Sequence, residues 1–285
     1  MKKLTFILTF IAITVLIASC DKMEGPYLQY DESVETTVEF PDLDKTTVYK
    51  KILVEEFTGH KCPNCPDGHR ILNTLSDTYG DTLITVCVHT GAFATPTSSF
   101  PNDYRTTEGT DLATNFSISS YPSAVFNQSQ YNGAYGVSKD NWAQAIGQFN
   151  HQPAIAAIQI INDFSGSTLT VHTKTTLLTE HENPVKLALF VIEDGIVSPQ
   201  IDGSTTIEDY VHNHVMRGSL NGTFGSYISE GGMVAADSSY TKSYQLDCAD
   251  KSWNFSRCSV VAILMDATPD SREVLQVEKR PFMHE

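Results

Sequence analysis

Residues 56–66 read EFTGHKCPNCP and place two cysteines, Cys62 and Cys65, in a C-x-x-C spacing. The apolar run 51–57 predicts a buried strand before them, and apolar residues at helical spacing in 67–79 predict a helix after them. Two thiols at this spacing can close a disulfide across one helical turn, and a helix N-terminus lowers the pKa of the first thiol. The order of strand, turn, C-x-x-C and helix therefore predicts a redox-active pair.

The roles of the two thiols follow from their places in the motif. Cys62 is expected to be the exposed nucleophile, and Cys65 the more buried thiol that resolves a mixed disulfide. Pro63 supports this placement, because a proline at the first helical position loses no hydrogen bond. The alternative for a C-x-x-C pair is half of a zinc site. Zinc needs a second Cys/His pair at similar spacing, and none follows closely.

The N-terminus has the features of a bacterial lipoprotein signal peptide. Residues 1–19 begin with two lysines and continue as an apolar run that is shorter than the roughly 20 residues of a spanning helix. Ile17-Ala18-Ser19-Cys20 then resembles a lipobox, so cleavage before Cys20 and lipidation of its thiol are expected. An ordinary secretory signal with an incidental cysteine is the alternative. The predicted protein is anchored to a membrane by lipid.

Composition excludes several classes of partner. The net charge of −15 becomes −17 once the two lysines of residues 1–19 are removed, which speaks against binding to nucleic acid or to an anionic membrane surface. No glycine-rich phosphate loop and no nucleophile elbow is present, so the sequence predicts no cofactor and gives no support to serine-hydrolase chemistry.

Three further cysteines lie outside the motif and the lipobox. Cys248 and Cys258 flank a probable loop between two strands, and in an oxidising compartment they are expected to form a structural disulfide. The alternative is a pair of free buried thiols. Cys87 lies in the apolar strand predicted at 83–89 and is expected to be buried as a small hydrophobic residue.

The chain divides into four predicted parts: a signal peptide (1–19), an acidic tether (20–47), an α/β domain (48–152) and an all-β domain (153–285). The α/β domain alternates strands and helices, with a long loop at 91–107. The last part consists of short β-rich runs without intervening helices, which predicts an antiparallel sandwich of the immunoglobulin-like kind. Those runs are 154–161, 168–178, 185–193, 240–246, 259–266 and 273–278.

The α/β part resembles a thioredoxin fold. The resemblance rests on Cys62-Pro63-Asn64-Cys65 after a strand and on Tyr121-Pro122 just before the β-rich segment 123–127. It implies that Pro122 is cis and lies beside the disulfide, and that Glu56 handles the proton of the second thiol. Two positions depart from the pattern, since Lys61 replaces the usual tryptophan and Pro66 replaces the usual basic residue.

The whole chain also resembles the outer membrane protein 28-related lipoproteins of Gram-negative bacteria. The matching stretches are Glu56–Gly59 with the C-x-x-C motif, the run VHNHVMR at 211–217, and Val274-Leu275-Gln276. This resemblance implies a lipoprotein anchored in the outer membrane, on its periplasmic face or at the cell surface. It carries no firmly assigned reaction.

His212 and His214 form a weak candidate for a metal site. In a strand, residues two apart share a face, so both imidazoles could bind zinc or copper. No third ligand is evident in the sequence, and a structural role in hydrogen bonding is the preferred interpretation.

Two hypotheses for function remain. In the first, a lipid-anchored envelope protein exchanges disulfides with protein thiols, with Cys62 attacking, Cys65 resolving, Pro122 shaping the peptide-binding edge and Glu56 moving the proton. In the second, the chain is a non-enzymatic surface-binding or adhesion lipoprotein, and Cys62–Cys65 is a structural disulfide.

Overall fold

The structure is a computed structural model that describes residues 38–283 except 230, 269 and 270. The predicted signal peptide, Cys20 and most of the predicted tether lie outside the described residues. In the described part of the chain, no helix is both long and apolar enough to cross a membrane. The last residues of the predicted tether form a single 3-10 turn, η1 (Lys45–Thr47), which is capped by the Asp44 side chain.

The first half of the chain is built around β1 (Ile52–Thr58), which is buried along its whole length. β1 pairs in parallel with β2 (Leu83–His89) on one side and antiparallel with β3 (Ser123–Phe126) on the other, and β3 continues to β4 (Val137–Ser138). Apolar cores pack on both faces of β1, so its side chains on both faces lie in the protein interior.

Successive residues of β1 point into two different cores, as the alternation of a strand requires. Ile52 and Val54 pack with Leu72 of α2 (Cys65–Tyr79) and Trp142 of α5 (Trp142–Phe149). Their neighbours Leu53 and Phe57 pack on the opposite face with α4 (Thr107–Asn115). Three short helical turns complete this half: η2 (Gly80–Thr82), α3 (Gly91–Ala94) and η3 (Lys139–Asn141).

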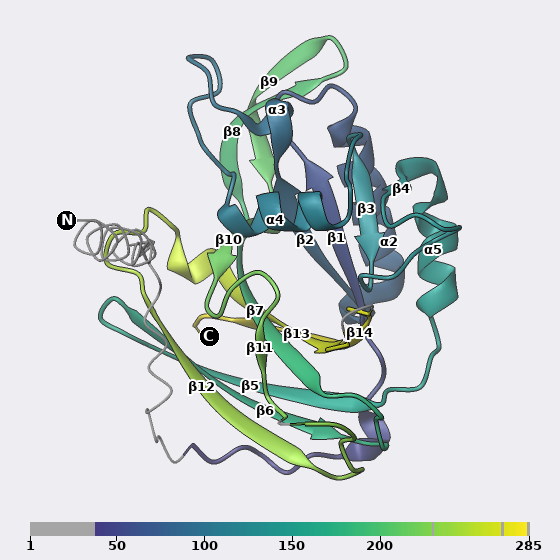
Figure 1. Cartoon of the computed structure of the whole chain (residues 1–285). Coiled ribbons are helices and arrows are strands. Elements are labelled where there is room, and N and C mark those ends of the chain that lie inside the picture. The colour runs from purple at the N-terminus through teal and green to yellow at the C-terminus, as the bar shows by residue number, and fades with distance from the viewer. Residues whose placement is uncertain (1–37, 230, 269–270, 284–285) are drawn as a thin grey trace, which may run out of the picture.

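The second half forms two antiparallel layers that face one another (Figure 1). One layer contains β7 (Val185–Glu193), β13 (Cys258–Asp266) and β14 (Val274–Pro281), and the other is the sheet of β5 (Ala156–Ser165), β6 (Thr168–Leu177) and β12 (Ser239–Asp247). Apolar side chains from both layers make one core between them. The β-rich character predicted for this half is therefore confirmed. A 3-10 turn, η4 (Phe255–Arg257), leads into β13.

Strand β10 (Val215–Ser219) joins the two halves, which the sequence did not predict. It pairs antiparallel with β7 and in parallel with β2, where Val215 lies opposite Cys87. The described residues thus form one mixed nine-stranded sheet in the order β14-β13-β7-β10-β2-β1-β3-β4, with β11 (Ser226–Tyr227) beside β7. The sheet contains strands from both sides of the boundary predicted at 152/153.

A hairpin of β8 (Ile196–Asp202) and β9 (Thr205–His212) projects from the second half toward the first. Figure 1 shows it standing beside α3, at the end of the first half from which α2 begins. No strand was predicted for these residues from the sequence. This hairpin, which we call the β8–β9 hairpin, brings residues 196–212 to the C-x-x-C motif.

The structure departs from the predicted bridge between Cys248 and Cys258, because both are free thiols. Each lies in the apolar core of the second half and is 1% exposed. Burial raises the pKa of the Cys258 thiol to about 12 and also raises that of Cys248, which favours the protonated form of both. A bridge between them in the oxidising envelope stays a prediction. Cys87 is a free buried thiol, as predicted.

Candidate functional site

Cys62 and Cys65 form a disulfide at the start of α2, with 5.4 Å between their Cα atoms. Cys65 is the first residue of the helix and Asn64 is its N-cap. Cys65 is fully buried, as the sequence predicted, but Cys62 is only 1% exposed. The prediction of an exposed Cys62 is therefore wrong for this structure. The loop that carries Cys62 packs against both the β8–β9 hairpin and the segment at Phe93.

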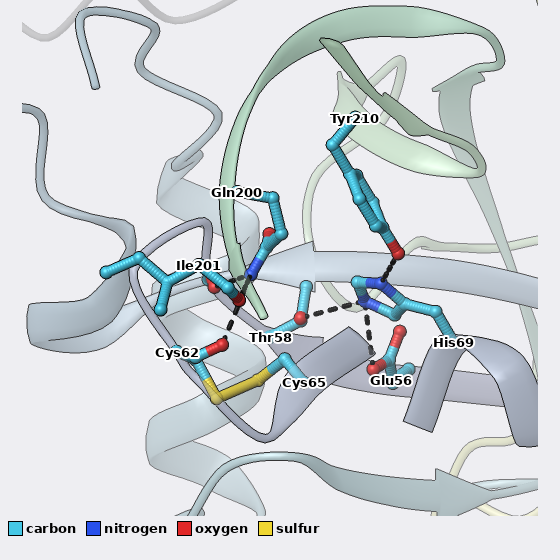
Figure 2. Close-up of a disulfide and its surroundings, with 9 residues drawn as sticks. Glu56, Thr58, Cys62, Cys65, His69, Gln200, Ile201 and Tyr210 are labelled. Atoms are coloured by element: carbon cyan, nitrogen blue, oxygen red, sulfur yellow. Dashed lines mark hydrogen bonds and ion pairs between the residues drawn. A yellow bond between two sulfur atoms is a disulfide. The ribbon is translucent and has the colours of Figure 1, made fainter. Parts of the chain in front are cut away.

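Backbone hydrogen bonds connect the β8–β9 hairpin to the loop that carries Cys62. Ile201 N donates to His60 O at 2.9 Å, and Gly203 N donates to Pro63 O at 2.9 Å. Between these two bonds, the side-chain nitrogen of the fully buried Gln200 donates to Cys62 O at 3.2 Å (Figure 2). The hairpin therefore occupies the backbone groups that surround the disulfide.

Two side-chain contacts fix the hairpin further out. Arg70 of α2 makes a bidentate ion pair with Asp202, with distances of 2.9 and 3.2 Å. The hydroxyl of buried Tyr104 donates to Ser198 at 2.8 Å. Because Arg70 is 56% exposed, its ion pair is worth about 1 kcal/mol at most.

Pro122 lies against the first turns of α2. The Tyr121-Pro122 bond is cis, as predicted. A Cβ added at Gly68 would meet the Pro122 ring at 3.2 Å and Trp142 at 2.8 Å, so only glycine fits where α2 approaches this loop. The helix that begins at Cys65 is thus packed directly on the proline.

Glu56 lies in the interior on the α2 side of β1 and is 0% exposed. The Cys87 thiol, opposite it on β2, donates to Glu56 Oε2 at 3.2 Å. His69 Nε2 lies 3.3 Å from Glu56 Oε1. Burial and the Glu56 charge raise the pKa of the Cys87 thiol well above its usual range, so this thiol keeps its proton.

His69 is a residue of the site that the sequence analysis missed. Its Nε2 lies 3.0 Å from Thr58 Oγ1 and its Nδ1 lies 2.6 Å from the Tyr210 hydroxyl of β9 (Figure 2). The signal for it was present, since His69 follows Cys65 by four residues and therefore shares its face of a helix. Tyr210 carried no signal, because only the β8–β9 hairpin brings it here.

A cavity of about 40 Å³ lies beside this group and is lined by Glu56, Cys87 and His69 together with His89, Tyr210 and His212. This is enough space for a water molecule. Burial lowers the pKa of His212 to about 3 and holds that of His89 well below its usual range. Both imidazoles are therefore neutral at neutral pH.

The two histidines singled out for metal binding take different partners. The ring of His212 lies 5.7 Å from that of His89 between centroids, whereas His214 Nδ1 lies 2.9 Å from Asp194. Within the described ranges, no group of three or more His, Cys, Asp or Glu side chains is placed to hold a metal ion.

A family profile described as outer membrane protein Omp28 matches residues 110–283, which is more than half of the chain. The chain belongs to the Omp28 family. This membership points to the outer membrane or the cell envelope as its location. The matched residues include the β8–β9 hairpin and β10, while Cys62 and Cys65 precede them. No curated protein matches the chain.

Among solved structures, HBP35 of Porphyromonas gingivalis aligns with a TM-score of 0.64 at 16% identity, over 82% of this chain and 76% of its own. A protein of Agrobacterium tumefaciens aligns with a TM-score of 0.50 at 12% identity, over 84% of this chain and 97% of its own. These likenesses concern the fold. A domain of the outer membrane lipoprotein Omp28 from Porphyromonas gingivalis matches at 20% identity over 44% of this chain and 86% of that one, with a TM-score of 0.30.

Proposed function

We propose that this Omp28-family chain is an envelope lipoprotein whose first half is thioredoxin-like and exchanges disulfides with protein thiols through Cys62 and Cys65. The observation that carries the proposal is the disulfide at the start of α2, with Glu56 buried on the neighbouring strand and Pro122 packed against the same helix. A helix N-terminus stabilises a thiolate at Cys62, and a buried carboxylate can take up or supply the proton of Cys65.

The competing function is a non-enzymatic surface-binding or adhesion lipoprotein in which the disulfide is structural. The burial of both cysteines favours this alternative, because a thiol that reacts with proteins must be reached by them. The same burial is compatible with exchange if the hairpin moves. The two functions differ in how readily the disulfide is reduced.

The reduction potential of Cys62–Cys65 decides between them. We expect a value between about −270 and −120 mV, the range of catalytic pairs, when the protein is equilibrated with glutathione or dithiothreitol buffers. Mass spectrometry of the alkylated protein gives the reduced fraction of the Cys62–Cys65 peptide. A Cys62→Ser/Cys65→Ser variant should show no redox transition in this range and serves as the control.

A potential below about −300 mV would contradict exchange and favour the structural disulfide. A second measurement is reduction or oxidation of a peptide disulfide by catalytic amounts of the protein. The Cys62→Ser variant should lose this activity entirely, because Cys62 is the thiol that the proposal assigns to the attack.

The proposal includes a lipid anchor at Cys20, on the periplasmic face or the cell surface. The support is the lipobox at residues 17–20 together with the membership in the Omp28 family. Mass spectrometry of the mature protein is expected to find acylated Cys20 as the first residue, and Cys20→Ala should leave an unprocessed or soluble product. An unmodified N-terminus at another residue would contradict the anchor.

A further inference from the structure

We propose that His69 is a positioning residue that carries a proton between Glu56 and the Tyr210 side of the site during each attack or release of Cys65. This inference rests on the proposed thiol–disulfide exchange and adds the route by which its proton leaves the interior. The observation behind it is the chain of contacts from Glu56 through His69 to Tyr210.

The position of His69 follows from the helix. Cys65 and His69 are four residues apart on α2 and lie on the face that packs toward β1. Glu56 points toward the same helix from β1, and its Oε1 lies 3.3 Å from His69 Nε2. The imidazole therefore stands next to the carboxylate on which the proton of Cys65 would be held.

Glu56 has few other ways to exchange a proton. It is 0% exposed, and its Oε2 accepts from the Cys87 thiol, whose raised pKa keeps that thiol protonated. His69 is 15% exposed and has its second nitrogen 2.6 Å from the Tyr210 hydroxyl. An imidazole can accept a proton at one nitrogen and release one from the other, so His69 links the buried carboxylate to the surface.

The surroundings of His69 are compatible with this role. The 40 Å³ cavity beside it has room for a water molecule next to Glu56 and Tyr210. The titratable and charged groups that face His69 come from α2, β1, β2, β8 and β9, and they are Arg70, Glu56, Cys87, His89, Asp202, Tyr210 and His212.

A substrate dithiol reacts with the Cys62–Cys65 disulfide in two steps. A substrate thiolate attacks Cys62 Sγ, the Cys62–Cys65 bond breaks, and Cys65 leaves as a thiolate that takes up a proton delivered from solvent through His69 and then Glu56. The second substrate thiol loses its proton to solvent and attacks the substrate sulfur of the mixed disulfide, releasing Cys62. The substrate is oxidised to a disulfide and the protein is reduced to a dithiol. In the reverse direction, the proton of Cys65 leaves through Glu56 and His69.

The test measures the step that Cys65 performs. Reduced protein is mixed with one equivalent of 5,5′-dithiobis(2-nitrobenzoate), and the second thionitrobenzoate released reports attack by Cys65 on the mixed disulfide at Cys62. His69→Gln is expected to slow this second release at least tenfold near neutral pH. The difference in this rate between His69→Gln and the wild type should shrink as the pH passes about 8.5, where hydroxide removes the thiol proton directly. Added imidazole should restore part of the rate in His69→Ala.

Two variants serve as controls. His151→Gln makes the same change at an exposed histidine and should release both equivalents at the wild-type rate. Tyr210→Phe removes only the hydroxyl at Nδ1, and a slowing of about threefold at neutral pH, vanishing at high pH, is expected. The Tyr210→Phe variant keeps the inference testable if His69→Gln fails to fold.

The outcomes separate the inference from the function. Second release in His69→Gln at the wild-type rate, or at a rate reduced equally at every pH, would overturn the relay while leaving exchange intact. A wild-type protein that releases no second equivalent at any pH would overturn the proposed function and the relay together.

Discussion

Replacement of both Gln200 and Asp202 by alanine is expected to speed reduction of the Cys62–Cys65 disulfide by a small phosphine about tenfold to a hundredfold. We expect the sulfur atoms to become accessible when the β8–β9 hairpin moves away, because Cys62 and Cys65 are 1% and 0% exposed and the hairpin is hydrogen-bonded to the Cys62 loop. The rate of reduction therefore follows the population in which the hairpin is open.

The size of the effect follows from the contacts that are lost. Gln200 donates to Cys62 O and Gly59 O, and net hydrogen bonds of this kind contribute about 1 kcal/mol each. The exposed Asp202–Arg70 pair adds about 1 kcal/mol at most. Since each 1.4 kcal/mol is a factor of ten in population, a loss of about 1.5–3 kcal/mol gives the range stated.

A matched control is the variant Gln245→Ala/Asp163→Ala, which changes the same residue types at exposed positions on the three-stranded sheet. It should be reduced at the wild-type rate. If the hairpin variant is reduced no faster than this control, the hairpin does not limit access to the disulfide. Circular dichroism and thermal unfolding establish that both variants are folded.

Raising the pH from about 5 to 9 is expected to lower the free energy of unfolding, and Glu55→Gln should remove much of that loss. Glu55 is fully buried on the α4 side of β1, and burial raises its pKa to about 8. Its Oε1 accepts from Gln128 at 3.0 Å, whereas Oε2 has no hydrogen-bond partner among the described residues. The neutral acid therefore suits this site better than the carboxylate.

The direction of the change follows from proton binding. The carboxyl of the unfolded chain loses its proton near pH 4.3, but the folded protein keeps the proton up to about pH 8. Between these values the folded state binds more protons, so stability is full below the unfolded pKa and falls as the pH rises to 8. The loss is about 5 kcal/mol at most.

Urea denaturation at several pH values measures this effect. Glu55→Gln keeps an oxygen for Gln128 and carries no charge, so its stability should vary less with pH and exceed that of the wild type at pH 9. Glu180→Gln changes an exposed glutamate and should follow the wild-type curve. Parallel curves for Glu55→Gln and wild type would show that Glu55 does not remain protonated in the folded state.

Local patterns predicted much of this fold. The apolar runs around the C-x-x-C motif place β1, α2 and β2 within a few residues of the predicted segments, and the six β-rich runs after residue 153 all correspond to strands. Glu56 and Pro122 lie close to α2, as the resemblance to a thioredoxin fold implied. The strands and helices depend on residues that are near one another in sequence, which is why short patterns reveal them, whereas the place of Pro122 followed from the resemblance alone.

The elements that the sequence did not predict, β9 and β10, depend on contacts between residues that are distant in sequence. Six of the eight side chains of β9 are polar or aromatic, and most of the strand is exposed. Its sequence therefore lacks the alternation of apolar and polar residues that predicts a strand. β10 is only five residues long and contains a glycine. Without these elements, neither the hydrogen bonds between the hairpin and the Cys62 loop nor the contact between His69 and Tyr210 could be predicted.

The insertion of β10 between β2 and β7 also has a consequence for how the chain folds during export. A chain that has emerged only as far as residue 152 has β2 with a free edge, because its partner lies at residues 215–219. Free edges can pair with other chains and promote aggregation. Completing the sheet requires contacts of long sequence separation, which form slowly. Cys62 and Cys65 therefore emerge before the β8–β9 hairpin that bonds to their loop, and we expect oxidants to reach both thiols during this interval.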